Sequence, residues 1–191
     1  MTGNRENKDR IRKRALSLRD SLDPLKRKAE EEYISNCISN DNRYVHSRDV
    51  LIYASFGSEV STARLIDNAL SEGRRVYLPR ITDSSRSLMD LVRIRDRSEL
   101  EKGHFGIPEP VGDELYRYED AGAYMVLPGA AFDREGDRIG YGKGFYDIFL
   151  KDRPGIYKVG ICFSCQFFEN IPAEDYDIRM DRVICGSGSD L

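Results

Sequence analysis

The sequence predicts an α/β protein with a mainly parallel sheet, and three observations point to this fold class. Short apolar runs at 50–54 and 76–78 enclose a helical pattern, so strand, helix and strand follow one another within about 30 residues. Further short apolar runs recur later, and none approaches the roughly 20 residues that span a bilayer. The first 40 residues carry helical patterns, which predicts N-terminal helices packed on the sheet.

The first predicted helix is basic and runs to about Leu22. Up to Arg19 it contains seven basic residues against two acidic ones, although the chain as a whole has a net charge of −3. Asp23 then offers an N-cap and Pro24 a favoured first helical position. A second helix is therefore expected from there to about Ser39.

The first predicted strand, Val50–Ala54, is followed by Ser61–Thr62, which can cap a helix that ends at Gly73. Val76–Leu78 is the next predicted strand, and Pro79 is expected to stop it because proline cannot donate to a strand ladder. A crossover helix between the two strands makes them parallel. Later strands are predicted at Leu88–Ile94, Tyr124–Leu127, Tyr157–Phe163 and Arg182–Ile184.

The composition restricts the possible partners and compartment. Lys and Arg total 30 against 33 for Asp and Glu, without a long tail of either sign, so nothing favours a nucleic acid or membrane partner. The first residues lack the apolar core of a secretory signal. Four cysteines in 191 residues are too few for a disulfide scaffold. We expect a soluble, cytoplasmic protein.

The most informative segment is Arg138–Asp147, which reads RIGYGKGFYD and leads into a predicted helix from Phe145 to about Leu150. Its three alternating glycines allow positive φ and a close approach of backbone N–H groups to a ligand. Arg138 and Lys143 add positive charge beside a helix N-terminus, which favours anions. Asp147 lies in the first helical turn, where a carboxylate can hold Mg²⁺ that bridges phosphate oxygens.

The alternative for this segment is a surface loop made flexible by its glycines. The flanking Arg, Lys and Asp residues and the strand–loop–helix context favour a phosphate site instead. Both common nucleotide fingerprints, GxxxxGK[ST] and GxGxxG, are absent. The residues alone therefore predict a phosphate or nucleotide site and no particular reaction.

The longer run LPGAAFDREGDRIGYGKGFYDIFL resembles the signature of the 5-formyltetrahydrofolate cyclo-ligase family, also called methenyltetrahydrofolate synthetase. Five other segments are similar, in order along the chain, to further elements of that family. They are Lys8–Arg12, Tyr53–Phe56 with Glu59–Thr62, Phe105–Pro110, Gly160–Ser164 with Gln166, and Met180–Val183. Because these segments span nearly the whole chain, chance is a poor explanation for the resemblance.

The resemblance implies a single, Rossmann-like, three-layer domain over residues 1–191, which includes the helices of residues 1–40. It also implies conversion of 5-formyltetrahydrofolate, with or without a polyglutamate tail, to 5,10-methenyltetrahydrofolate. ATP phosphorylates the N5-formyl oxygen, N10 attacks the formyl carbon, and ADP and phosphate are released. The implied cofactors are ATP and Mg²⁺, and we expect a monomer.

The family's site residues can be carried over position by position. The implied ATP contacts are Lys8, Arg12, Arg138, Ile139, Gly140, Tyr141, Gly142, Lys143, Gly144, Phe145 and Tyr146. The implied folate contacts are Ala54, Glu59, Tyr141, Gly142, Lys143, Gly144 and Phe145. The implied metal ligands are Asp147 and Asp181. We expect Lys143 and Arg138 to stabilise the moving phosphoryl group, and Glu59 to orient the folate and accept a proton near N10.

Two positions depart from the family pattern. Phe145 stands where the family commonly has tyrosine, so a hydroxyl contact is lost while ring packing is retained. Ser61 occupies a position that is often acidic. Neither change removes a group that phosphoryl transfer requires.

Other motifs have simpler interpretations. The basic helix lacks the interleaved aromatic residues of an RNA-binding arm, and only Lys8 and Arg12, one turn apart, stand out from a solvated face. Cys162 and Cys165 form a C-x-x-C, but Cys162 lies in an apolar strand and is expected to pack there. Asp133 and Asp137 are expected to cap turns, with a supporting role near the metal left open for Asp133.

Two rival functions remain open at this stage. One is a non-catalytic relative that binds nucleotide or folate, although it would not need both carboxylates for a metal. The other is an enzyme of the same family that acts on a different pterin or a different formylated amine. The phosphate-binding residues would be the same in that enzyme, because the shape of the pocket determines pterin selectivity.

Overall fold

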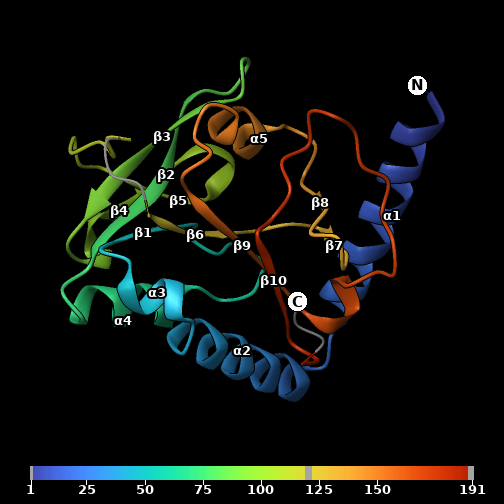
Figure 1. The fold of residues 1–191 in the computed structure, drawn as a ribbon, viewed down its shortest axis with the longest axis horizontal. Helices are drawn as coiled ribbons and strands as arrows, with labels where there is room; N and C mark the ends of the chain where they lie inside the picture. Colours follow the sequence, from blue (N-terminus) through green and yellow to red (C-terminus); the bar gives the residue numbers. More distant parts are fainter. Residues whose placement is uncertain (1, 119–121, 189–191) are drawn as a thin grey trace.

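A six-stranded sheet forms the centre of the structure, a computed structural model that describes residues 2–118 and 122–188 (Figure 1). The strand order is β10-β9-β6-β1-β2-β3, and all neighbours are parallel except β2 and β3. These strands are β1 (Asp49–Ile52), β2 (Arg75–Asp83), β3 (Leu88–Ile94), β6 (Tyr124–Leu127), β9 (Tyr157–Cys162) and β10 (Arg182–Cys185). The predicted α/β fold with a mainly parallel sheet is confirmed; its Rossmann-like character and single-domain extent stay predictions.

Helices cover both faces of the sheet (Figure 1). The helices are α1 (Thr2–Asp20), α2 (Pro24–Ser39), α3 (Asn42–His46), α4 (Ala63–Ser71) and α5 (Phe145–Leu150). Val50 and Ile52 of β1 pack into the cluster that contains α2, α3 and α4, whereas Leu51 packs into the cluster that contains α5. Both faces of the strand are thus buried, as expected for a parallel sheet between helical layers.

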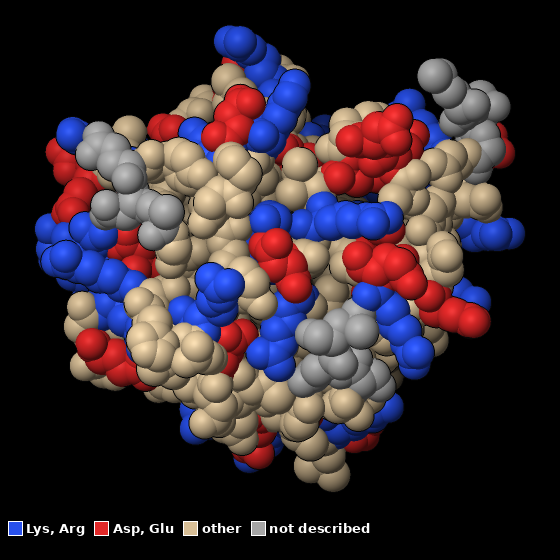
Figure 2. Space-filling model, in the orientation of Figure 1, with Lys and Arg blue, Asp and Glu red and all other residues tan. Residues whose placement is uncertain are grey.

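Helix α1 lies at the edge of the molecule, beside the ribbon formed by β7 (Ala131–Phe132) and β8 (Arg138–Ile139) (Figure 1). Ala15, which is fully buried, packs from α1 against Ala130 and Ile139. In the described part of the chain, no helix is both long and apolar enough to cross a membrane. Acidic and basic side chains are interspersed over the face shown in Figure 2, in keeping with the balanced composition.

The predicted start of α2 is confirmed. The Asp23 carboxylate accepts hydrogen bonds from the backbone N–H groups of Leu25 and Lys26, both at 3.0 Å. Pro24 occupies the first helical position, where its missing N–H leaves no partner unsatisfied. This cap sets the point at which the chain turns from α1 toward the sheet.

The prediction that Pro79 ends its strand is wrong, because β2 continues through it and pairs with β3 at Leu91. The backbone N–H of Arg75 points toward β1, where it bonds to the Arg48 carbonyl at 2.9 Å. By alternation the nitrogen of Pro79 faces the same side. Pairing between β1 and β2 ends at Tyr77, so the proline removes no bond from the ladder.

Thr62 is the N-cap residue of α4, as predicted, but its side chain makes no capping hydrogen bond. The Thr62 hydroxyl donates to the Tyr53 carbonyl at 2.7 Å and accepts from the Ser55 N–H at 3.0 Å. Thr62 therefore fixes the chain where it leaves β1. Gly73 follows the end of α4 with φ of 74°, the left-handed conformation that glycine favours.

Short elements complete the fold, and the sequence patterns did not reveal them because they are two or three residues long. They are β4 (Leu100–Lys102), β5 (Pro108–Pro110) and the 3₁₀ turns η1 (Arg97–Glu99), η2 (His104–Gly106) and η3 (Ser164–Gln166). Antiparallel pairing of β4 with β5 holds the η2 turn between them.

Gly160 in β9 faces the ring of Phe132, which is fully buried. A Cβ atom at Gly160 would lie 2.3 Å from the Phe132 ring, closer than real Cβ contacts permit. Since Phe132 has no open space into which to move, the close approach of this strand requires glycine.

We therefore predict that Gly160→Ala lowers the free energy of unfolding by about 1–3 kcal/mol, because it overpacks the core. Urea denaturation followed by circular dichroism measures the change. Gly112→Ala is the matched control: its added methyl meets neighbours at 3.5 Å or more, and we expect little change. Equal stability of the two variants would contradict the packing argument.

Candidate active site

A cavity of about 280 Å³ opens at the carboxyl ends of the central strands. Tyr53 and Ala54 line it directly after β1, Pro79 lines it from β2, and Pro128 lines it directly after β6. Side chains that leave neighbouring parallel strands converge at this edge of a sheet, where α/β proteins bind their ligands.

The glycine loop closes one side of this cavity. Gly142 and Gly144 have φ of 92° and 70°, so the predicted need for positive φ is confirmed at these two positions. Nε of Arg12 donates to the Gly140 carbonyl at 2.7 Å, which ties the loop to α1. A Cβ atom at Gly142 would contact the same guanidinium at 3.7 Å.

The turn that precedes the loop is organised by the buried carboxylate of Asp133. It accepts from the N–H groups of Glu135 and Asp137 at 3.1 and 2.9 Å, which confirms the predicted turn cap, and from Ile171 N–H at 2.9 Å. Burial raises the pKa of Asp133. The prediction that the Asp137 side chain caps a turn is wrong, because its carboxylate binds the Arg179 guanidinium at 2.8 and 3.1 Å.

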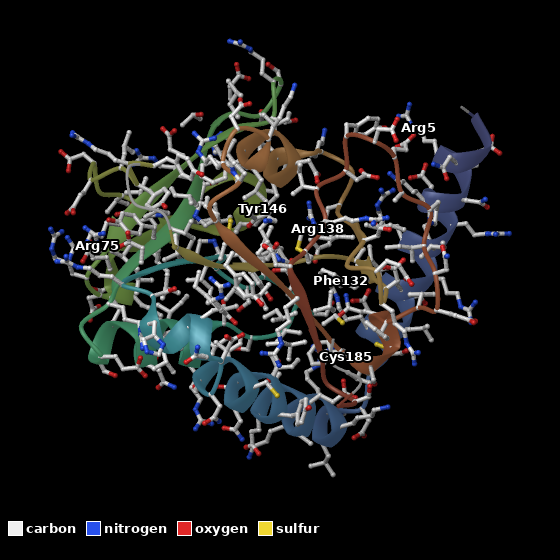
Figure 3. All side chains as sticks on the ribbon, in the orientation of Figure 1. Arg5, Arg75, Phe132, Arg138, Tyr146 and Cys185 are labelled. Atoms are coloured by element: carbon white, nitrogen blue, oxygen red, sulfur yellow. The ribbon has the colours of Figure 1, made fainter. Side chains whose placement is uncertain are left out.

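Arg138 is the central cation of the site. Its Nη2 donates to both carboxylate oxygens of Asp147 at 3.1 Å, and its Nη1 donates to the Pro128 carbonyl at 3.2 Å. Its guanidinium carbon lies 5.6 Å from the centre of the Tyr146 ring, close to it in the interior (Figure 3). The Nε atom is buried without a hydrogen-bond partner among the described residues. A buried donor without an acceptor is costly, so this site suits an additional anionic or polar group.

Glu59 lies in the segment that follows β1, and its side chain lines the cavity. One carboxylate oxygen accepts the Tyr141 hydroxyl at 2.5 Å, and the other accepts the Phe56 N–H at 2.9 Å. Burial and then the charge of Glu59 raise the pKa values of Tyr53, Tyr141 and Tyr146. These phenols therefore stay protonated as hydrogen-bond donors across the physiological range.

Lys8 on α1 is buried and ion-paired rather than free. Its Nζ binds Glu174 at 2.9 Å and also binds Asp177. Burial alone would lower the pKa of Lys8, but hydrogen bonds and charges from Asp177 and Glu174 raise it above the ordinary value of 10.5. The residue is thus a cation at the junction of α1 with the segment around residue 175.

Comparison with known proteins agrees with this geometry. The sequence profile of the 5-formyltetrahydrofolate cyclo-ligase family matches residues 4–186. The chain belongs to this family. A 5-formyltetrahydrofolate cyclo-ligase of Haemophilus influenzae is 28% identical over 188 residues, which cover 96% of this chain and all of the relative. The Escherichia coli K12 enzyme of the same name is 33% identical over 151 residues, covering 75% of this chain and 80% of that one.

A solved structure has a similar fold. The chain is similar to the 5,10-methenyltetrahydrofolate synthetase of Aquifex aeolicus, with a TM-score of 0.83 and 32% identity. The match covers 95% of this chain and 90% of that one. The curated relatives are enzymes of the ligase class. Because this chain belongs to the same family, it is a cyclo-ligase.

The structure brings together most of the residues that the family resemblance singled out. Those that line the cavity are Ala54, Glu59, Arg138, Gly140, Tyr141, Gly144, Phe145, Tyr146 and Asp147. Ile139 instead faces the small core beneath α1, and Lys143 is exposed at the tip of the loop. Lys143 makes no hydrogen bond or ion pair with any described residue. The ligand contacts of all these residues stay predictions.

The two predicted metal ligands lie on different elements. Asp147 in α5 lines the cavity, where it accepts from Arg138 and from the Ile178 N–H at 3.2 Å. Asp181 lies directly before β10, and its carboxylate binds the Lys158 N–H at 2.7 Å and the Lys158 ammonium at 2.6 Å. Within residues 2–118 and 122–188, no cluster of three or more His, Cys, Asp or Glu side chains is arranged to hold a metal. The assignment of both carboxylates to Mg²⁺ stays a prediction.

Several lining residues were not identified from the sequence. Phe105 is 62% exposed at the mouth of the cavity, in a turn that gives it an unusual φ of 57°. The nearly buried carboxylate of Glu109 supports this turn by accepting the His104 N–H at 3.1 Å. The other lining residues missed are Pro79, Ile81, Met89, Ile107 and Pro128. The segment FGIPEP contributed to the resemblance, but nothing in its sequence indicated that it turns toward the glycine loop.

Cys162 packs as predicted for a small apolar side chain, since it is fully buried. The neighbour of Cys162 is Cys185, its register partner on β10, rather than Cys165 of the C-x-x-C. Burial raises the pKa of Cys162, and the hydrogen bond from Cys162 lowers that of Cys185 to about 6.

The Lys8 ion pairs lead to a testable pH dependence. Because the folded-state pKa is raised, their stabilisation is fully present below about pH 10.5 and is lost as the pH rises through the folded-state value. We predict that Lys8→Met is less stable than the parent at pH 8, with a smaller difference at pH 11. Urea unfolding at pH 8 and pH 11 measures the difference in the free energy of unfolding. Arg10 is an exposed cation on the same helix that does not titrate in this range, so Arg10→Met is expected to show no such trend. A stability difference between Lys8→Met and the parent that is the same at both pH values would refute the prediction.

Proposed function

We propose that the protein closes 5-formyltetrahydrofolate to 5,10-methenyltetrahydrofolate, with Mg-ATP converted to ADP and phosphate. The observation that carries this proposal is the cavity that Arg138 and Glu59 share. It combines a cation suited to a phosphoryl group with a carboxylate suited to an amine, and apolar side chains line most of the space between them. We also propose that the protein acts as a cytoplasmic monomer.

Positioning is the main requirement of the phosphoryl step. A formamide oxygen is a weak nucleophile, so the enzyme must hold it in line with the γ-phosphoryl group and neutralise the charge that moves. Arg138 is rigidly held by Asp147 and Pro128 and offers an immobile cation for this purpose. Lys143 projects from the loop without a protein partner among the described residues, and can follow the phosphate.

The ring-closing step requires a proton acceptor. When N10 attacks the activated formyl carbon, the C–O bond to the phosphorylated oxygen breaks, phosphate leaves, and N10 loses its proton. Glu59 is oriented by the Tyr141 hydroxyl and the Phe56 N–H, and accepts that proton. The carboxylate also fixes the folate before the phosphoryl step.

The carboxylates of Asp147 and Asp181 fit a hard cation such as Mg²⁺ only in part. Asp147 presents carboxylate oxygens to the cavity, and oxygen ligands of this kind together with phosphate oxygens and water suit Mg²⁺. Bound there, Mg²⁺ supplies neutralising charge on the phosphate oxygens. For Asp181 to join it, the carboxylate must leave Lys158. We propose Asp147 as the main protein ligand and Asp181 as a second one.

The direct test is absorbance of the methenyl chromophore after the protein is mixed with 5-formyltetrahydrofolate, Mg²⁺ and ATP. We predict a rise that requires ATP and that slows about 10- to 100-fold in Lys143→Ala, since a charge-assisted contact to the phosphate is lost. Lys151→Ala, another exposed lysine close by, is the matched control and is expected to keep the parent rate.

The outcomes separate the rival functions. Absence of the rise with ATP still bound would reject this substrate and favour another pterin or a binding protein. A rise of equal rate in Lys143→Ala would keep the reaction but reject the role of Lys143 in it.

A second prediction concerns Glu59. We expect Glu59→Gln to lower kcat by about a hundredfold or more, because the amide cannot accept the N10 proton, while KM for the folate changes less. Steady-state kinetics measure both constants, with the exposed Glu32→Gln as control. Full turnover in Glu59→Gln would exclude the proton-acceptor role.

A further inference from the structure

We infer that Arg19 and Tyr141 form a positioning relay for Glu59. Arg19 binds the Tyr141 hydroxyl, and this hydroxyl in turn binds the carboxylate, so a residue of α1 controls the folate end of the cavity. The inference rests on the proposed function of Glu59 and adds two positioning residues to it.

The relay is a continuous chain of hydrogen bonds. Nη1 of Arg19 donates to the Tyr141 hydroxyl at 2.7 Å, and that hydroxyl donates to Oε1 of Glu59 at 2.5 Å. The direction of the chain is determined by its chemistry. A guanidinium has donors only and a carboxylate accepts, so the single phenolic proton must point at Glu59.

Arg19 is itself held in place. The residue is 7% exposed, and its Nε donates to the Ser58 hydroxyl at 2.9 Å. Arg27 donates to the backbone carbonyls of Arg19 and Ser58 at 2.7 and 2.8 Å, which joins α1, α2 and the segment that carries Glu59. The guanidinium therefore has little freedom to leave Tyr141.

Tyr141 lies in the glycine loop, between Gly140 and Gly142. Its ring lies 5.7 Å from the Arg19 guanidinium carbon. Without Arg19 the hydroxyl can rotate away from Glu59, and the loop loses a hydrogen bond to α1 while it keeps the bond from Arg12 to the Gly140 carbonyl. Both losses disorder the carboxylate that the folate must meet.

A double-mutant cycle tests the relay. Arg19→Met, Tyr141→Phe and the double variant are compared with the parent by calorimetric titration with 5-formyltetrahydrofolate. Each single change is expected to weaken binding about tenfold, the loss typical of a hydrogen bond to a charged group. Since the residues act in series, the double variant is also expected to lose about tenfold rather than a hundredfold. Arg14→Met, an exposed arginine of α1, should bind like the parent.

Two further measurements distinguish loss of the relay from a general loss of structure, and test the relay independently of the proposed function. In Tyr141→Phe, KM for the folate should rise several-fold more than KM for ATP, a division that a merely structural role would not produce. Melting temperatures without ligand should show the same non-additivity, so the relay can be judged even if the parent binds no folate and the proposed function fails.

Additive losses in the binding cycle, or single variants that bind like the parent, would overturn the relay. If Arg19→Met does not fold, Arg19→Lys takes its place in the cycle, because it keeps the charge but offers a shorter donor. Non-additive losses with Arg19→Lys would support the relay, and additive ones would reject it.

Discussion

The buried guanidinium of Arg138 is the interaction on which the site depends. A cation whose side chain is 4% exposed must be compensated inside the protein, and its two partners come from different segments. The Pro128 carbonyl follows β6, Asp147 lies in the first turn of α5, and Asp147 in turn accepts a hydrogen bond from the Ile178 N–H. One charge thus fixes how the glycine loop leaves the sheet and where α5 starts. Under the proposed function, an incoming phosphate would meet a cation already paired, and would have to share it or release Asp147 to a metal.

The same arrangement recurs on α1, where positive charge is paired before any ligand arrives. Lys8 is engaged by Glu174 and Asp177, and Arg12 by Asp9 and the Gly140 carbonyl. Paired cations keep defined positions, which removes part of the ordering cost of binding. Under the proposed function, their partners would have to be exchanged when ATP binds. Lys143 differs, since it extends from the loop without a partner among the described residues.

Sequence reasoning predicted what is local and failed where contacts join distant segments. The βαβ unit, the Asp23 cap and the glycine loop each depend on neighbours in sequence, and all were recovered. Pro79 was misjudged because its tolerance depends on where β1 ends, which the pattern around residue 79 does not contain. The cavity wall at Phe105 was missed because only the β4–β5 pairing turns that segment toward the glycine loop. Site assignments beyond the glycine loop came from the family resemblance.

The basic helix shows why a periodicity rule can find a helix and miss its buried face. Lys8, Arg12, Ala15 and Arg19 follow one another at spacings of four, three and four residues, which places them along one side of α1. A search for apolar residues at helical spacing finds only Ala15 on this side of α1, so the arginines are interpreted as solvent-exposed charges. Their partners are a carboxylate pair, a backbone carbonyl and a phenol, each more than 120 residues away. Three of the seven basic residues of α1 are therefore paired with polar acceptors inside the protein, and Arg12 and Arg19 tie the helix to the glycine loop.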